Sequence, residues 1–166
     1  KALMKNYIVV TGGAGFVGSN LIEYLISKTN KKILSIDNYS CGFKKNHNLS
    51  KRIKYIKADT KNINKVLSKY KNQINSLFHF GEFSRIFQSF NKFDECFQSN
   101  SIGTQATFKF CLDNKIKLIY SATSASLGNN GNDKDLSPYA FTKSKNLELL
   151  NNLKKWFNFK FEIIYF

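Results

Sequence analysis

The 166-residue chain has the length of one domain, and its 42% hydrophobic content with a single proline excludes a disordered protein. A formal net charge of +15 raises the question of a nucleic-acid partner. Only Arg52 and Arg85 are arginines, however, and the lysines are scattered among asparagines instead of forming a stripe. The charge pattern therefore argues against nucleic-acid binding and fits a milder attraction of an anionic small ligand.

The three cysteines, Cys41, Cys96 and Cys111, are far apart and form no CxxC pair. This spacing predicts no metal site and no disulfide framework, and it fits idle thiols in a reducing cytoplasm. No apolar run reaches the length of a membrane helix, and no signal peptide is recognisable. We therefore expect a cytoplasmic protein without a membrane partner.

Short apolar runs alternate with longer amphipathic ones along the whole chain. In order, they predict a strand at 7–10, a helix at 16–27, strands at 32–36 and 53–57, a helix at 63–70, a strand at 77–80, a helix at 93–113, a strand at 118–121, a helix to about 156 that Ser137 caps and Pro138 opens, and a strand at 161–166. This rhythm predicts one α/β domain over 1–166. We expect a doubly wound parallel sheet, strand order 3-2-1-4-5-6, with helices on both faces.

A glycine-rich turn, Thr-Gly-Gly-Ala-Gly-Phe-Val-Gly at 11–18, joins the first strand to the first helix. In such a turn, backbone N–H groups approach a pyrophosphate at the positive end of the helix. A side chain on Gly12 or Gly15 would block the tight turn or the close approach, and Gly18 would let the helix pack on the strand. The setting between a strand and a helix predicts a dinucleotide-binding (Rossmann) site.

Asp37 ends the second strand, about 20 residues beyond the turn, where a carboxylate binds the adenosine ribose hydroxyls. Because a carboxylate there repels a 2′-phosphate, the sequence favours NAD over NADP. The alternative is that Asp37 only forms a turn before Asn38.

The glycine spacing Gly-x-x-Gly-x-x-Gly resembles the short-chain dehydrogenase/reductase superfamily, and its flanks resemble the extended branch of NAD-dependent epimerase/dehydratases that act on nucleotide sugars. Further segments similar to that branch are Asp37-Asn38, Asp59-Thr60, the run from His79 to Glu82, Asn100 to Thr104, Tyr120 to Gly128 and Ser137 to Lys145. The resemblance, with the glycine turn and Asp37, implies cofactor contacts from Gly12, Gly15, Phe16, Val17, Gly18, Asp37, Asn38, Asp59, Thr60, Phe80, Gly81, Asn100 and Lys143.

Tyr139 and Lys143 match the catalytic Tyr-x-x-x-Lys of the family. Four residues apart, they share one face of a helix, and an ammonium near a phenol favours the phenolate. The resemblance implies that Tyr139 takes the proton from a sugar hydroxyl and that Lys143 also holds the nicotinamide ribose. A third catalytic hydroxyl matches Thr123 when counted from Gly128, and Ser124 is the alternative.

Four departures from the family pattern affect the substrate side. Glu82 follows Gly81 where the family has a second small residue, so Glu82 either faces substrate or points away. Leu127 replaces the usual Tyr, the polar loop at 129–136 is short, and the chain stops before the family's Asn-x-Tyr-Gly segment. We expect the substrate-binding lobe to be absent, with Glu82, Ser84 and Ser124 as candidate substrate contacts and Arg85 as a further one.

The sequence therefore predicts the cofactor half of an NAD-dependent nucleotide-sugar epimerase or dehydratase, an isomerase or a lyase. An epimerase is favoured because no Asp-Glu pair follows Thr123. We expect the chain alone to bind NAD without turnover, and the full-length protein to form a homodimer through its helices. The alternatives are a non-catalytic NAD(P)-sensing protein and, on charge alone, a nucleic-acid binder.

Overall fold

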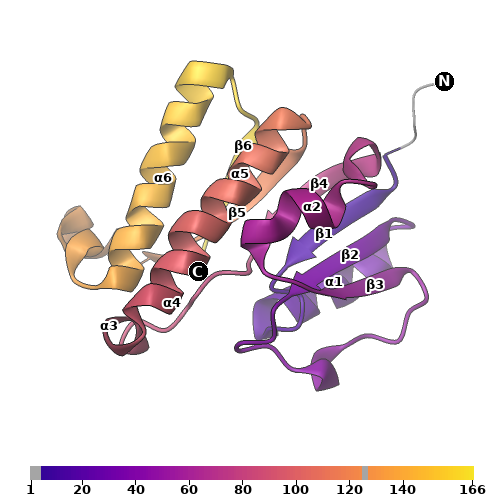
Figure 1. The fold of residues 1–166 in the computed structure, drawn as a ribbon, viewed down its shortest axis with the longest axis horizontal. Helices are drawn as coiled ribbons and strands as arrows, with labels where there is room; N and C mark the ends of the chain where they lie inside the picture. Colours follow the sequence, from indigo (N-terminus) through magenta and orange to yellow (C-terminus); the bar gives the residue numbers. More distant parts are fainter. Residues whose placement is uncertain (1–4, 125–126) are drawn as a thin grey trace.

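The computed structural model describes residues 5–124 and 127–166, so Ala125 and Ser126 of the serine-rich segment lie outside the described residues. Six parallel strands form one sheet in the order β3-β2-β1-β4-β5-β6, which confirms the predicted order (Figure 1). The strands are β1 (Tyr7–Thr11), β2 (Lys32–Asp37), β3 (Ile53–Lys57), β4 (Ile74–His79), β5 (Lys117–Ala122) and β6 (Phe161–Tyr165).

Helices cover both faces of this sheet, as predicted (Figure 1). The chain forms α1 (Phe16–Lys28), α2 (Ile63–Leu67), α3 (Gln88–Asn91), α4 (Phe93–Phe97), the π-helical segment η4 (Gln98–Gly103), α5 (Thr104–Asp113) and α6 (Pro138–Phe157). Short 3₁₀ turns are η1 (Lys44–Asn46), η2 (Thr60–Asn62), η3 (Lys71–Gln73) and η6 (Gly128–Asp135). No helix within the described ranges is long and apolar enough to cross a bilayer.

The side chains of β1 point alternately to the two faces of the sheet, and each face is covered by its own layer of helices. Val9 packs into a core with side chains of α2, α5 and α6, whereas Ile8 and Val10 pack with Ile22 and Leu25 of α1. Because successive side chains of a strand point to opposite faces, a central strand covered on both sides is apolar throughout. This double burial fixes β1, and with it the glycine turn that follows.

Several element boundaries differ from the sequence prediction. Helix α2 ends at Leu67, three residues early. Strand β4 starts at Ile74, three residues early, because Ile74 and Ser76 pair with β1 on either side of a register shift. The predicted helix at 93–113 is interrupted by η4, and α3 was not predicted. Periodicity does not report a π-helical turn, which adds one residue without changing the composition.

Candidate functional site

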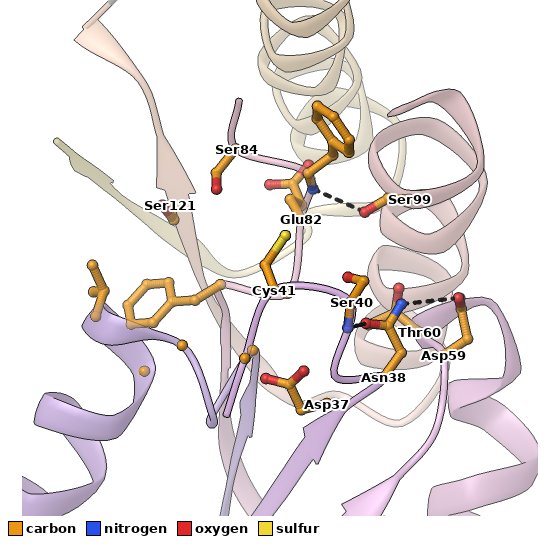
Figure 2. A pocket seen from close by; sticks show the side chains of 18 of the residues that line it. Asp37, Asn38, Ser40, Cys41, Asp59, Thr60, Glu82, Ser84, Ser99 and Ser121 are labelled. Carbon is orange, nitrogen blue, oxygen red and sulfur yellow. Dashed lines mark hydrogen bonds between the residues drawn. The ribbon is translucent and has the colours of Figure 1, made fainter. Parts of the chain in front are cut away.

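A cavity of about 680 Å³ opens at the carboxyl ends of the strands, where ligands of doubly wound sheets bind (Figure 2). Figure 2 shows Asp37, Asn38 and Asp59 at one end of it and Glu82, Ser84 and Ser121 at the other. The predicted residues that line it are Gly12, Gly15, Phe16, Val17, Gly18, Asp37, Asn38, Asp59, Thr60, Phe80, Gly81, Glu82, Ser84, Thr123, Tyr139 and Lys143.

The glycine turn is closed by backbone contacts that leave no room for side chains at two positions. Gly12 has φ +71°, and a Cβ on it would lie 2.6 Å from the Phe80 carbonyl oxygen. A Cβ on Gly18 would lie 2.1 Å from the Gly12 oxygen. We expected Gly18 to let the helix pack on the strand, and its nearest neighbours are instead atoms of the turn itself. The fold therefore requires glycine at both positions.

Gly15 is different, because the fold leaves it space. A Cβ there would meet only the Gly12 oxygen, at 3.3 Å, and Gly15 faces the cavity. Gly15 is also the N-cap of α1, with no capping side chain and no acidic residue in the first turn of the helix. Unpaired N–H groups and the positive end of a helix dipole attract an anion, so this cradle fits the pyrophosphate of a dinucleotide.

Asp37 lines the cavity and also orders the loops around it. One carboxylate oxygen accepts a 2.9 Å hydrogen bond from the Ala14 N–H, and the other accepts a 2.8 Å hydrogen bond from the Tyr39 N–H. Each oxygen has a second lone pair, so these contacts leave the carboxylate able to accept ribose hydroxyls. The turn-forming interpretation and the ribose-binding interpretation of Asp37 are compatible in this geometry.

Asp59 and Thr60 form the neighbouring wall. Asp59 caps η2 by accepting from the Lys61 N–H, and its carboxylate accepts a long, 3.5 Å hydrogen bond from the Asn38 amide. Thr60 is buried against Gly103, where a Cβ would lie 2.3 Å from the Thr60 hydroxyl oxygen. Gly103 thus lets the end of η4 approach this wall closely.

The first turns of α6 carry Tyr139 and Lys143 into the cavity wall. Ser137 caps the helix by accepting from the Ala140 N–H at 3.0 Å, and Pro138 occupies the first helical position, as predicted. Tyr139 and Lys143 are buried, with exposed fractions of 9% and 4%. Thr123, at the end of β5, lines the same cavity, whereas its alternative Ser124 is exposed and outside the lining.

Glu82 turns toward α6. Its carboxylate lies 2.8 Å from the Lys143 ammonium, and the exposed side-chain fractions are 4% for Glu82 and 5% for Lys143. The ammonium also donates to the Ser121 carbonyl and lies 4.8 Å from the centre of the Tyr120 ring. The second carboxylate oxygen accepts from Thr104, Tyr120 and Asn146, and we call these five side chains (Glu82, Lys143, Thr104, Tyr120 and Asn146) the ion-pair cluster.

A row of hydrogen bonds links this cluster to β1. The Thr11 hydroxyl accepts from the Phe80 and Gly81 N–H groups, so its proton points to His79 Nδ1, 2.7 Å away. His79 Nε2 then donates to the Thr104 hydroxyl at 2.8 Å, and Thr104 donates to Glu82. Complete burial, opposed by Glu82 and reinforced by Lys143, lowers the pKa of His79 to about 4, so His79 is a neutral structural residue.

Asn100 lies behind the wall and not in it. It is fully buried in η4, where its side chain accepts from the Phe83 N–H and donates to the Phe83 carbonyl. Sequence reasoning missed Thr104, Tyr120 and Asn146, because nothing in their local patterns marks them as partners of one carboxylate. It also passed over Cys41, an exposed thiol that lines the cavity. Among the described residues, no group of histidine, cysteine and carboxylate side chains could hold a metal ion.

The cavity, its glycine cradle and the Tyr139–Lys143 pair can be compared with known proteins. The model of the NAD dependent epimerase/dehydratase family matches residues 8–165, nearly the whole chain. The chain belongs to this family. The strand order and the site geometry agree with that membership.

Curated relatives of this epimerase/dehydratase-family chain have different activities. It is 34% identical to an ADP-L-glycero-D-manno-heptose-6-epimerase of Brachyspira hyodysenteriae, over 89% of this chain and 49% of that protein. It is 31% identical to a UDP-N-acetyl-alpha-D-glucosaminuronate decarboxylase of Bacillus cytotoxicus, over 75% of this chain and 39% of that protein. The chain thus spans half or less of the length of these two relatives.

Solved structures give the same fold. A UDP-N-acetylglucosamine 4-epimerase of Methanobrevibacter ruminantium, in complex with UDP-N-acetylmuramic acid, superposes with a TM-score of 0.84 at 28% identity, covering 97% of this chain and 54% of that one. A UDP-glucose 4-epimerase of Brucella ovis in complex with NAD gives a TM-score of 0.84 at 19% identity, covering 96% of this chain and 51% of that one. At 19% identity, the second likeness concerns the fold alone.

Proposed function

We propose that this chain is the NAD-binding part of an enzyme that oxidises a hydroxyl of a nucleotide sugar, most similar in chemistry to an epimerase. The observation that carries the proposal is the joint lining of one cavity by Tyr139, Lys143, Asp37 and the glycine turn. Family membership implies NAD as cofactor. The names of similar proteins, with UDP-sugar and ADP-sugar activities, support a nucleotide sugar as substrate.

In this proposal each residue has a distinct role. Gly15 and the start of α1 bind the pyrophosphate, and Asp37 binds the adenosine ribose hydroxyls. Tyr139 takes the proton from the sugar hydroxyl, and Thr123 orients that oxygen. Lys143 holds the nicotinamide ribose, and its ammonium favours the tyrosinate. NAD, when bound, supplies the hydride acceptor.

Calorimetric titration with NAD and NADP tests the cofactor part of this proposal. We expect NAD to bind at least about tenfold more tightly than NADP, a difference of about 1.4 kcal/mol, because the Asp37 carboxylate repels a 2′-phosphate. The Asp37→Asn variant removes the charge and keeps one acceptor, so it should narrow that preference. Equal affinities for both cofactors in the parent protein would contradict the role of Asp37.

The catalytic part is tested by Tyr139→Phe in the whole enzyme of which this chain would be the NAD-binding part; the change removes one hydroxyl from a buried ring. We expect unchanged NAD affinity and a loss of NAD-dependent turnover of about 10²-fold or more, as for removal of a general base. UDP-glucose and ADP-heptose are suitable first probes. Full activity of this variant would contradict the proposed role of Tyr139.

A further inference from the structure

Glu82 is a buried acid that the roles above do not use. It follows Gly81, three residues after the end of β4 at His79. Its side chain is only 4% exposed, although Glu82 is one of the residues that line the cavity. A carboxylate in this position therefore has to be explained by what it contacts.

The contacts of Glu82 come from three different elements. One oxygen faces the Lys143 ammonium at 2.8 Å. The other accepts from the Thr104 hydroxyl of α5 at 2.9 Å, the Tyr120 hydroxyl of β5 at 3.2 Å and the Asn146 amide of α6 at 3.1 Å. Donors from three directions hold the carboxylate in one place, so it can hold Lys143 in one place as well.

The other titratable groups around the pair are uncharged near neutral pH. Burial lowers the pKa of His79 to about 4 and raises the pKa of Cys96, and burial followed by the Glu82 charge raises the pKa of Tyr120 well above its usual value. Lys143 and Glu82 therefore offset each other's charge beside side chains of His79, Cys96 and Tyr120 that are themselves neutral.

Stability alone does not explain such a pair. Two buried charges lose hydration, and replacement of a buried ion pair by apolar side chains is often neutral or stabilising. The pair does, however, hold the flexible four-carbon side chain of Lys143 in one position. The ammonium it fixes belongs to a residue that lines the cavity.

We propose that Glu82 is a positioning residue that holds the Lys143 ammonium at the cavity wall in the orientation that binds the cofactor. The inference rests on the proposed function, in which Lys143 holds the nicotinamide ribose. Glu82 acts only through Lys143 and does not exchange a proton with the substrate.

Calorimetric titration of NAD into the Glu82→Gln variant is the first test. We expect the affinity for NAD to fall about tenfold, because Lys143 loses its charged partner and its side chain is no longer held in one position. Glu148→Gln is the matched control, since Glu148 also pairs with a lysine, Lys145, but lies at the surface with 63% of its side chain exposed. This control should stay within about twofold of the parent. A folded Glu82→Gln protein with the parent affinity overturns the proposal.

The Lys143 ammonium provides a second readout in the parent protein, independent of whether Glu82→Gln folds. In ¹⁵N-lysine-labelled protein, a buried, paired ammonium exchanges slowly with water and gives its own NMR signal, which Lys143→Arg assigns by its disappearance. Lys145, in an exposed pair with Glu148, is the internal comparison. We expect a resolved Lys143 signal that is lost in Glu82→Gln. Exchange as fast as that of Lys145 in the parent overturns the proposal.

These measurements separate the two hypotheses. Absence of NAD binding by the parent would contradict the proposed function, while the NMR signal would still decide whether Glu82 fixes Lys143. Normal NAD binding, inactive Tyr139→Phe and an unaffected Glu82→Gln would leave the proposed function standing and reject the positioning role.

Discussion

The two ends of the cavity are built by different means. At the glycine-turn end, backbone N–H groups and a helix terminus face the cavity, and the fold demands glycine at Gly12 and Gly18. At the other end, buried side chains from the segment after β4 and from β5, α5 and α6 meet in the ion-pair cluster. Backbone recognition depends on the presence of glycine at certain positions, whereas the cluster depends on partners that are distant in the chain.

Substitution of Lys143 should disrupt the ion-pair cluster more than any other change considered for the cavity. We expect Lys143→Met to lower the free energy of unfolding by about 3–5 kcal/mol, because it leaves the Glu82 carboxylate buried without its cation. Urea unfolding measures this. Lys117→Met is the control, since Lys117 pairs with Glu162 at the surface, with exposed fractions of 50% and 64%, and should change stability by about 1 kcal/mol or less.

A double variant sharpens this prediction. Replacing Glu82 with Leu in the Lys143→Met protein removes both charges, and most of the lost stability should return. If the double variant is no more stable than Lys143→Met, the penalty does not come from a stranded carboxylate.

A second prediction concerns pH and the row of hydrogen bonds behind the cluster. In the folded protein the pKa of His79 is about 4, below the usual value of about 6.5. Between these two pH values, His79 is therefore protonated in the unfolded chain and neutral in the folded one. Above about pH 6.5, His79 makes its full contribution to the free energy of unfolding. That contribution falls by about 3 kcal/mol as the pH drops toward 4. Denaturant unfolding of parent and His79→Gln across this range should show a shallower pH dependence in the variant. Equal slopes would mean that His79 is not held neutral.

The smallest expected effects on stability lie at the glycine turn. Two substitutions there separate a role in folding from a role in binding NAD. Gly18→Ala should destabilise the protein by about 1–3 kcal/mol, because the backbone of the turn has to move. Gly15→Ala should change stability by less than about 1 kcal/mol yet weaken NAD binding about tenfold, since its methyl group projects into the cavity. Calorimetry and urea unfolding on both variants decide this. Equal losses of stability would show that Gly15, too, serves only the fold.

Sequence reasoning recovered the glycine-turn end well for a physical reason. Gly12, Gly15, Gly18 and Asp37 are signals of local geometry, each readable from its place after a strand. The strand order also followed from the alternation of strands and helices along the chain, which is typical of a doubly wound sheet. The π-helical segment η4 and the short helix α3 were not predictable, because neither changes the periodicity enough to be noticed.

The ion-pair cluster could be predicted only in part. Tyr139 and Lys143 were found because they match the catalytic Tyr-x-x-x-Lys of the family, and Glu82 stood out because it departs from the family pattern. That Glu82 would meet Lys143, 61 residues away, depends on how β4, β5 and α6 pack. Asn146 and Tyr120 look like an ordinary helix residue and an ordinary strand residue until the fold brings them to the same carboxylate.

The row of hydrogen bonds from Thr11 to Glu82 has a consequence for proton traffic. Its protons all point one way, and within the described residues it ends at the Phe80 and Gly81 N–H groups, which do not release protons. With His79 neutral, the row provides no exit through the protein. Under the proposed function, this row therefore offers no path by which a proton from the sugar could pass from Glu82 to β1.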